Sequence, residues 1–592
     1  MIDAEPCVDT IIDNIADTGP KMKISKEIWE TKYAAYPGET HSDAMSRIAK
    51  SLEDNVEHGK ALYDILSTMR FLPAGRIQAG AGSSRKVTMM NCFVSGVIED
   101  SMQSIMQRAS EAAETMRMGG GIGYDFSNIR PRGDLIKSMN SRASGPVSFM
   151  GIFDAICKTV ASAGHRRGAQ MATLRVSHPD IEEFIDAKRD NDTLTAFNIS
   201  VAITDEFMNA VHQDNTFDLT FEGHVYKTVR ARDLWDKIML STWDWAEPGV
   251  IFIDRMNKEN NVSYAQEIIS TNPCSEIPLQ AYGACLLGSF NLVKYIRDEE
   301  LTNTKYLDYI GLVNDIPHVV RMMDNVNDRT IYPLPEQQAE ALKFRRIGIG
   351  VTGMANALEL LGFTYGSDSY IQQQSSILRL IRDCCYRSST ELAGEKGSFP
   401  LLNRDKFLSS PFVLRLPSDI RELIKEHGIR NSHLLSLAPT GTISITADNV
   451  SSGIEPVFSH SYKRTIQTFD GPVVEDVEDY AYHYYGLKGK TANECSVMDH
   501  VKVAAHAQRY VDQSISKTCN VGDDVTFEEF KDVYLEAYHK GCKGVTTFRN
   551  AGKRYGVLVN KPSTTEATSD DEIDKTPTAC YINPTTGKKE CE

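Results

Sequence analysis

The sequence lacks the features that would place it in a membrane, in the secretory pathway or on nucleic acid. Across its 592 residues, no apolar run approaches the length of a membrane-spanning helix. The first residues, MIDAEPCVDTIIDNIADTG, have neither the basic start nor the continuous apolar segment of a signal peptide. Positive charge is in deficit, because 64 Lys and Arg stand against 80 Asp and Glu for a net charge of −16. We therefore expect a cytoplasmic protein that binds neither a membrane nor a nucleic acid polymer.

Cysteine, by contrast, is not scarce. The cytosol keeps thiols reduced, so the 12 cysteines indicate buried residues or reaction chemistry rather than a disulfide framework. Hydrophobic residues make up 41% of the chain and charged residues 24%, the ordinary balance of a globular protein. A chain of this length can bury a large core without disulfides.

Three regions differ in pattern. Residues 1–90 indicate a mainly helical N-terminal region, in which 42–69 carries spaced apolar residues among charges. Residues 91–559 alternate helices with short apolar stretches, which favours an α/β barrel or a large open α/β sheet. Residues 560–592 contain the polar run KPSTTEATSDDEIDKTPT. Because that run is too poor in apolar side chains to fold, we expect a flexible linker and a short tail with Cys580 and Cys591.

The most specific segment is Thr271–Leu279, TNPCSEIPL. In an extended segment, side chains two positions apart point to the same side. Asn272, Cys274 and Glu276 would then present an amide, a thiol and a carboxylate to one substrate. The flanking prolines resist helix formation. Taken alone, however, the spacing favours a buried structural cysteine in a loop.

Other segments carry weaker signals. Cys92 in MMNCFV and Cys285 in GACLLGSFNL lie in apolar stretches, where a lone cysteine is typically a small core residue. In LAPTGTIS, hydroxyls and backbone N–H groups surround a glycine and could form a phosphate-binding nest without any lysine. The candidate residues of that nest are Thr440, Gly441, Thr442 and Ser444. An ordinary Ser/Thr-rich turn is the alternative.

In combination and in this order, the motifs resemble the catalytic chain of ribonucleotide reductase. FLPAGR, NCFV, GGGIG, NPCSEIPL, CLLGSFNL and PTGTISI with SSGIEP extend the resemblance from about Phe71 to about Leu558. It implies a ten-stranded α/β barrel with a central finger loop. It also implies that Cys274 becomes a thiyl radical that abstracts the ribose 3′ hydrogen, with Glu276 as base on the 3′-hydroxyl.

The remaining roles follow from the same resemblance. Asn272 would hold the substrate hydroxyls, and Cys92 and Cys285 would be the dithiol that reduces the 2′ carbon and ends as a disulfide. The reaction would convert ribonucleotides, which we take to be diphosphates, into 2′-deoxyribonucleotides. A general base within hydrogen-bond reach and two thiols that approach to disulfide distance are what this chemistry needs.

Members of the family differ in the source of the radical. One class receives it from a second subunit through adjacent tyrosines, but Thr546 and Thr547 occupy that place here, and threonine is too hard to oxidise. The glycyl-radical class carries an Arg-x-x-Gly-Tyr-like loop, which the surroundings of Gly552 do not match. FLPAGR and KGVTTFRNAGKRYGVL resemble the class that cleaves the cobalt–carbon bond of adenosylcobalamin. We therefore expect adenosylcobalamin as cofactor and assign no metal-ligating residue.

Two alternatives stay open. The chain could be a catalytic subunit that needs a separate radical-generating subunit. It could also be a catalytically inactive, nucleotide-binding regulatory homologue. The second alternative is disfavoured by the complete set of Asn272, Cys274, Glu276, Cys92 and Cys285, since a protein that only binds nucleotides needs none of these thiols.

The resemblance extends to control sites. The helix expected from Asp100 to Met118 resembles the family's dimer-interface helix, whose start at Asp100 and Ser101 would help to bind a deoxynucleoside triphosphate effector. The stretch from Cys92 to Cys274 is too short for the insertion by which monomeric members of the family mimic a dimer partner, so we expect a homodimer. Ordinary N-capping would equally explain these two residues. Arg130 would neutralise effector phosphate, and Arg166 lies in HRRGAQM, which resembles the loop that reports effector identity.

Two further expectations concern the ends of the chain. The residues before Cys92 leave no room for the family's ATP-binding cone, so we expect no overall control by ATP and dATP. At the other end, Cys580 and Cys591 would re-reduce the Cys92–Cys285 disulfide and would receive electrons from a thioredoxin-type reductant. A flexible linker of about 20 residues spans roughly 25 Å, enough to bring a tail thiol to a barrel mouth.

Overall fold

A computed structural model gives the structure of most of the chain. It describes residues 18–137, 139–160, 168–190, 192–299, 304–468, 471–522, 524–549, 552–553, 559–560, 580–582 and 589–591. The linker expected within 560–592 and the effector-loop residue Arg166 lie outside the described residues.

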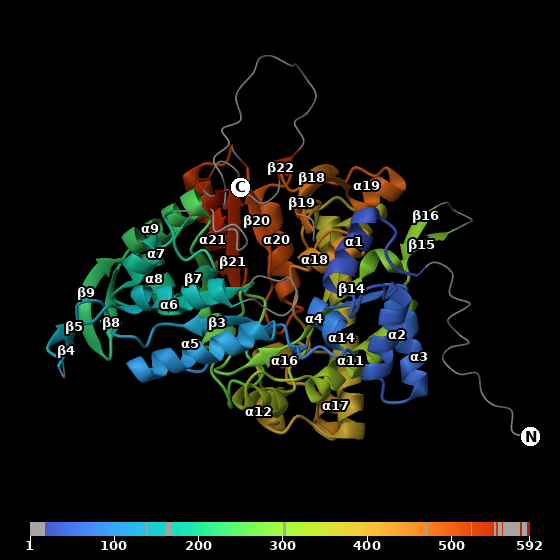
Figure 1. The fold of residues 1–592 in the computed structure, drawn as a ribbon, viewed down its shortest axis with the longest axis horizontal. Helices are drawn as coiled ribbons and strands as arrows, with labels where there is room; N and C mark the ends of the chain where they lie inside the picture. The colour runs from blue at the N-terminus through green and yellow to red at the C-terminus, as the bar shows by residue number, and fades with distance from the viewer. Residues whose placement is uncertain are drawn as a thin grey trace, which may run out of the picture.

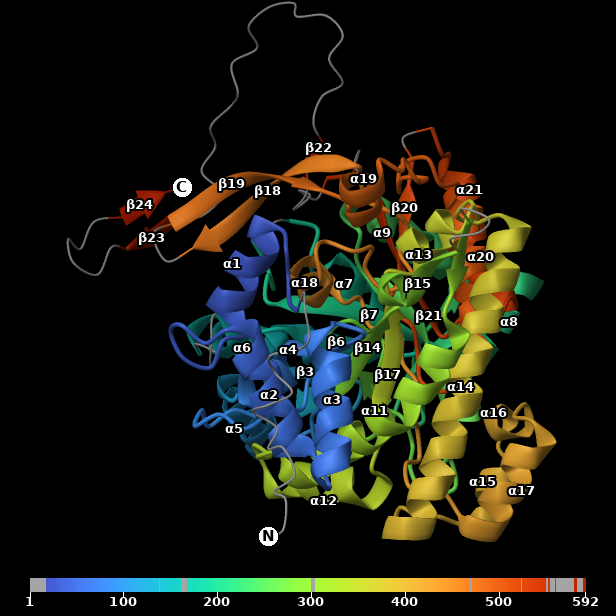
Figure 2. The same cartoon turned by 90° about the vertical axis from the view of Figure 1, so that its right-hand side faces the viewer.

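Three helices open the described chain: α1 (Lys23–Lys32), α2 (His41–Leu52) and α3 (Val56–Ser67). A capping box in which Thr40 and Asp43 bond each other's backbone fixes the start of α2. The apolar residues of 42–69 form the buried faces of α2 and α3, which confirms the helices expected there. In Figures 1 and 2 these helices lie together along one side of the molecule.

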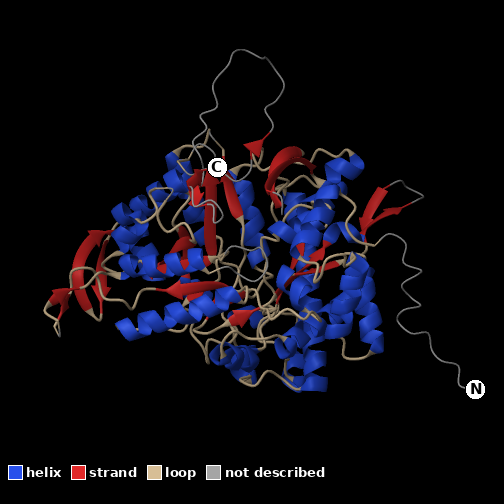
Figure 3. Cartoon of the chain, viewed as in Figure 1, coloured by secondary structure: helices blue, strands red, loops and turns tan. Residues whose placement is uncertain are grey.

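Most central strands belong to one eight-stranded sheet, in the order β13-β2-β3-β6-β7-β10-β21-β20. Its strands are β2 (Cys92–Val94), β3 (Gly121–Asp125), β6 (Gln170–Arg175), β7 (Phe197–Ile203), β10 (Gly249–Phe252), β13 (Ala284–Cys285), β20 (Thr518–Val521) and β21 (Gly544–Arg549). The five strands from β2 to β10 are parallel, whereas β13 and β21 join them antiparallel. In Figure 3 helices surround the strands at the middle of the molecule, while other strands stand at its outer edges.

A second, three-stranded sheet consists of β1 (Phe71–Pro73), β14 (Leu287–Asn291) and β17 (Gly348–Thr352). Only Leu286 separates β13 from β14, so one stretch of chain joins the two sheets. Beyond β17, the described residues make the isolated bridges Ile349–Leu435 and Leu437–Ile515 instead of a further named strand.

The mixed α/β class is confirmed, but the described residues show no continuous ring of ten strands. One physical reason lies beside the isolated bridges. The carboxylate of Asp512 accepts the backbone N–H groups of Leu434 (2.8 Å) and Leu435 (3.0 Å), so a side chain takes donors that a ladder would use.

Helices cover the sheets on the outside. Ser101 caps α5 (Met102–Arg117) by accepting the backbone N–H of Ser104, which confirms the helix expected from Asp100 to Met118. The other long helices are α6 (Pro146–Thr159), α9 (Ala231–Trp245), α11 (Tyr309–Arg329), α14 (Asp368–Lys396), α20 (Val497–Gln508) and α21 (Phe527–His539). None of the helices described is both long and apolar enough to cross a bilayer.

The smaller elements lie between these. Short helices are α4 (Gly75–Gly80), α7 (Ile181–Asp186), α8 (Asp205–Gln213), α10 (Ile253–Lys258), η3 (Leu292–Tyr295), α12 (Pro335–Phe344), α13 (Met354–Leu360), α15 (Arg404–Leu408), α16 (Pro411–Leu414), α17 (Ser418–His427), α18 (Gly441–Thr446) and α19 (Tyr480–Tyr485). The strands outside the two sheets are β4 (Leu135–Ile136), β5 (Ser141–Arg142), β8 (Thr216–Phe221), β9 (His224–Arg230), β11 (Ser270–Thr271), β12 (Pro278–Leu279), β15 (Ile296–Glu299), β16 (Thr304–Leu307), β18 (Ser461–Thr468), β19 (Gly471–Glu478), β22 (Val559–Asn560), β23 (Cys580–Ile582) and β24 (Lys589–Cys591).

A buried ionic network ties α11 to the segments that flank the second sheet. The guanidinium of Arg345 bonds Asp324 (2.9 Å) and Asp328 (2.7 Å), and Arg430 also bonds Asp324 (3.0 Å). The side chain of Asp324 is fully buried. Losing one cation would leave buried carboxylate charge uncompensated, so this network makes the position of α11 dependent on Arg345.

Candidate active site

The loop that carries Cys274 is a tight turn at the centre of the molecule. Strands β11 and β12 pair antiparallel and close it. The side-chain oxygen of Asn272 accepts the backbone N–H of Ile277 (2.9 Å), and Ser275 adopts a left-handed conformation (φ 66°). The extended geometry expected for Asn272–Glu276 is therefore wrong, because the asparagine side chain bends the loop back on itself. The expectation that the amide, thiol and carboxylate share one side is met by the turn instead.

Two glycines of the GGGIG motif let this loop approach β3. A Cβ on Gly123 would lie 1.8 Å from the backbone oxygen of Thr271, a contact that no side chain tolerates. A Cβ on Gly121 would lie 3.2 Å from the ring of Pro273, which is tight but allows a small adjustment. The motif thus has a packing role: it sets how closely the Cys274 loop sits on the sheet.

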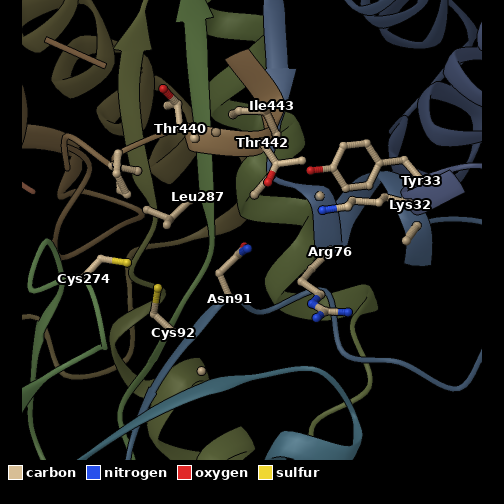
Figure 4. Close-up of a pocket in the computed structure, with 18 of the residues that line it drawn as sticks. Lys32, Tyr33, Arg76, Asn91, Cys92, Cys274, Leu287, Thr440, Thr442 and Ile443 are labelled. Atoms are coloured by element: carbon tan, nitrogen blue, oxygen red, sulfur yellow. The ribbon is translucent and has the colours of Figure 1, made fainter. Parts of the chain in front are cut away.

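A cavity of about 800 Å³ brings the predicted catalytic residues together. Asn272, Cys274, Glu276 and Cys92 all line it. Figure 4 shows the sulfur atoms of Cys92 and Cys274 in the same space. The amide nitrogen of Asn272 donates to the sulfur of Cys92 (3.2 Å), so one side chain both shapes the loop and orients a thiol.

Cys285 lies directly behind Cys92. The two residues are opposite each other in the antiparallel pairing of β13 with β2. Opposite Cα atoms in such a pair lie within disulfide range. Cys285 is fully buried in a small apolar cluster that also contains Cys92, and burial raises the pKa of its thiol to about 12. The pair is therefore a buried dithiol with one member facing the cavity.

The phosphate nest predicted around Gly441 forms one wall of the same cavity. Thr440 adopts a left-handed conformation (φ 49°), and α18 starts at Gly441. Thr440, Gly441 and Thr442 line the cavity. Ser444 does not line it, because its buried hydroxyl lies 3.0 Å from that of Ser452.

A second cavity, of about 610 Å³, lies on the other side of the loop. Thr546, Thr547 and Phe548 of β21 line it together with amides and hydroxyls such as Asn198, Ser452 and Asn520. The linings of the two cavities have Pro273, Cys274 and Pro439 in common. Among these three, only Cys274 carries an atom that can be oxidised, so it is the one redox-active side chain that the described linings share.

The predicted control and tail residues lie elsewhere in the chain. Arg130 bonds the carboxylate of Asp100 (2.5 Å), and Ser101 acts as a helix cap. Cys580 and Cys591 are opposite each other in the pairing of β23 with β24. Asp100, Ser101 and Arg130 are not among the residues that line either cavity.

Comparison with known proteins agrees with this geometry. Residues 90–548 match the family described as ribonucleotide reductase, barrel domain. The chain belongs to the ribonucleotide reductase family. The vitamin B12-dependent ribonucleoside-diphosphate reductase of Mycobacterium tuberculosis is 33% identical over 561 residues, covering 88% of this chain and 78% of that protein. The protein of the same name from Thermoplasma acidophilum is 33% identical over 540 residues, with coverage of 86% and 67%.

More distant members of the ribonucleotide reductase family also match. The ribonucleoside-diphosphate reductase subunit alpha of Chlamydia muridarum is 26% identical over 608 residues, covering 87% of this chain and 57% of that protein. The resemblance drawn from the motifs is thereby confirmed at the level of the family.

Sequence reasoning missed three parts of this reductase site. Basic residues Lys32, Arg76, Arg85 and Lys86 line the first cavity, and only Arg76 stood in a recognised motif. The second cavity carries no motif apart from the threonines of β21. The buried residues Arg346 and Gln513, which lie behind Cys285, gave no signal because tertiary contacts alone bring them there.

Proposed function

We propose that the chain is an adenosylcobalamin-dependent ribonucleoside-diphosphate reductase. The observation that carries the proposal is the position of Cys274, which lines two cavities at once. This arrangement suits a radical enzyme, because the sulfur can be oxidised from one cavity and can act on a substrate in the other. One sulfur at the boundary can serve both purposes.

The first cavity supports the chemistry on the substrate. Cys274 would take the 3′ hydrogen atom, and Glu276, buried in the same lining, would hold the proton of the 3′-hydroxyl. Asn272 would orient the substrate hydroxyls. Cys92 and Cys285 would supply two electrons and end as a disulfide while water leaves the 2′ carbon.

The end of the first cavity that is far from Cys274 supports phosphate binding. Thr440, Gly441 and Thr442 would hold one phosphate through hydroxyl and backbone N–H groups. The basic residues Lys32, Arg76, Arg85 and Lys86 would add positive charge to a second one. The diphosphate assignment also follows the names of the relatives from M. tuberculosis and T. acidophilum.

The second cavity supports a cofactor as the source of the radical. Its volume suits a nucleoside-sized group, and Asn198, Ser452 and Asn520 offer hydrogen bonds to an adenine or a ribose. When bound, adenosylcobalamin supplies an oxidising radical by homolysis of its cobalt–carbon bond. Thr546 and Thr547 stand in this lining where a subunit-dependent enzyme would need tyrosines.

We further infer the finer features of the family. The two sheets would be the halves of a ten-stranded barrel whose finger loop carries Cys274. Met102 and Met106 are exposed on α5 (60% and 46%), which supports a homodimer through this helix. Asp100, Ser101 and Arg130 would bind a deoxynucleoside triphosphate there.

The tail would be the reducing arm. Cys580 and Cys591 are opposite each other in the two-stranded pairing of β23 with β24. Residues that are far apart in sequence are therefore neighbours in the fold. We infer that they reduce the Cys92–Cys285 disulfide and are themselves reduced by a thioredoxin-type protein. Because the cycle consumes free thiols, a reducing compartment such as the cytosol is required.

Turnover by the purified chain tests the proposal. Ribonucleoside diphosphate, adenosylcobalamin and dithiothreitol should yield deoxynucleotide with no other protein present. Cys274→Ser should abolish product and keep nucleotide binding, whereas Cys384→Ser, a matched change outside both cavities, should retain activity. Product that appears only after a metal-containing partner protein is added would establish the subunit alternative.

A further inference from the structure

The two cysteines of the buried dithiol have different surroundings. Cys92 lines the substrate cavity and accepts a hydrogen bond from the amide of Asn272. Cys285 is absent from that lining and fully buried. Its thiol faces the side-chain oxygen of Gln513 at 3.8 Å. A reductant in the cavity therefore meets the sulfur of Cys92 first.

The amide of Gln513 is held in one orientation. Its nitrogen donates to the backbone oxygens of Ile347 (2.8 Å) and Leu435 (3.3 Å). Its oxygen must then point the other way, where it accepts hydrogen bonds from the thiol of Cys285 and from the guanidinium of Arg346 (3.3 Å). The side-chain oxygen of Gln513 thus holds the guanidinium of Arg346 and the thiol of Cys285 close to each other.

Arg346 is a buried cation beside this thiol. Its side chain also donates to the backbone oxygen of Pro278 (3.2 Å), and its Nη2 atom is buried without a hydrogen-bond partner. Within the described part of the chain, no carboxylate forms an ion pair with it. The carboxylate of Asp512 is instead engaged by two backbone N–H groups and Tyr386. A buried guanidinium without a carboxylate is costly, so the fold retains it against a stability penalty.

We propose that the Cys92–Cys285 disulfide is opened in one direction, with the reducing thiolate attacking Cys92 and Cys285 leaving as a thiolate beside Arg346. The disulfide itself is a product of the proposed reductase reaction, so the inference rests on that function. It adds the identity of the attacked sulfur and assigns Arg346 as a positioning residue for the leaving group.

The exchange balances as two substitutions at sulfur. The incoming thiolate bonds to Sγ of Cys92 while the bond to Sγ of Cys285 breaks, and that electron pair stays on Cys285, which then takes a proton. The second thiol of the reductant, as thiolate, attacks the mixed disulfide and releases Cys92, which is protonated in turn. The reductant ends as a disulfide, and the enzyme regains both thiols.

Arg346 matters because burial opposes the leaving thiolate. The Cys285 site raises the pKa of the thiol to about 12, and among the charges that act on it Arg346 lowers the pKa whereas Asp512 and Glu276 raise it. Thiolates of lower pKa leave faster. The Nη2 hydrogens of Arg346 have no hydrogen-bond partner, and a thiolate accepts such donors much more strongly than a thiol does. His433 and Lys543 also lie near Arg346, and burial lowers the pKa of both, which weakens them as competing cations.

Mapping a monothiol adduct tests the direction. The dithiol is oxidised by turnover in one sample and by diamide in another, mixed with 2-mercaptoethanol, quenched in acid, and capped with N-ethylmaleimide. Peptide mass spectrometry should find at least tenfold more adduct on Cys92 than on Cys285. Equal adducts, or an excess on Cys285, would overturn the proposal. Failure to form the disulfide by turnover alone would count against the reductase function, because the diamide sample still reads the direction.

The role of Arg346 has its own readout. Arg346→Gln should slow re-reduction of the oxidised pair by dithiothreitol roughly tenfold, since it removes the charge beside the leaving sulfur. Arg346→Lys should recover the rate to within about threefold. Arg404→Gln, which removes an exposed cation far from this cluster in sequence, should have no effect. Equal slowing in the Gln and Lys variants would indicate a packing role only and would refute the assignment.

Discussion

Replacing Gly123 with alanine should disable the enzyme without touching any reacting group. The added Cβ would lie 1.8 Å from the backbone oxygen of Thr271, so the base of the Cys274 loop must move by at least about 1.2 Å to reach a tolerable 3.0 Å. A displacement of about 1 Å at a reacting group costs on the order of 100-fold in rate. Overpacking of this kind should also cost about 1–3 kcal/mol in free energy of unfolding.

The same substitution at two other glycines should have smaller effects on the rate. Gly121→Ala meets the ring of Pro273 at 3.2 Å, which can give by a few tenths of an ångström, so its rate should fall by less than about tenfold. Gly151→Ala lies on α6 with open space around it, so activity should persist and the protein should gain about 0.5–1 kcal/mol in stability. All three changes are the same in chemistry and differ only in what the new methyl group meets.

The assay measures deoxynucleotide formation under saturating cofactor and dithiothreitol, with urea unfolding and nucleotide binding recorded on the same preparations. Gly123→Ala should bind nucleotide within a few-fold of the wild type while its kcat collapses. If it retained more than half of the wild-type kcat, the claim that Gly123 sets the height of the Cys274 loop would be refuted. If its activity loss matched a loss of folded protein, the effect would be one of stability alone.

Three further changes test other parts of the structure. Arg130→Ala should weaken effector binding and flatten the substrate preference measured with each deoxynucleoside triphosphate; an unchanged preference would remove Arg130 from the effector site. Double replacement of Cys580 and Cys591 by Ser should stop multiple turnover with thioredoxin but not with dithiothreitol, and undiminished turnover with thioredoxin would eliminate the reducing arm. Arg345→Met should lower the free energy of unfolding by about 3–5 kcal/mol, because it leaves Asp324 buried beside one fewer cation; a change below 1 kcal/mol in urea unfolding would show that Arg430 alone compensates.

Local patterns in the sequence were enough to predict helices such as α5, but they did not predict the tertiary contacts of those helices. The apolar spacing of 102–116 and the cap at Ser101 were enough to predict α5, since both signals are local. The motif order pointed to residues that lie around one cavity, such as Cys92, Cys274 and Thr440, because a family resemblance carries tertiary information that spacing does not. It also pointed to Ser444, which does not line that cavity. The turn at Asn272 was missed because it depends on one side-chain hydrogen bond and on a left-handed Ser275.

Other features could not have been predicted from the sequence by local reasoning. The partnership of Arg346 with Gln513 joins residues far apart in sequence, and neither belongs to a recognisable chemical motif. The lack of a continuous ring of strands depends in part on where the Asp512 carboxylate points, which no periodicity encodes. Whether a side chain takes the place of a backbone hydrogen-bond acceptor depends on the folded structure as a whole.

The loop between the two cavities has a consequence for how such enzymes can diversify. The two cavities have the sulfur of Cys274 in common and share no other oxidisable lining atom among the described residues. Under the proposed function, the group that oxidises Cys274 could therefore change without a change in the cavity that holds the substrate. The relatives that this chain matches differ in name: some are called vitamin B12-dependent reductases, and another is called a reductase subunit alpha. With one oxidisable sulfur in the loop between the two cavities, the source of the radical could differ between enzymes while the substrate cavity stays the same.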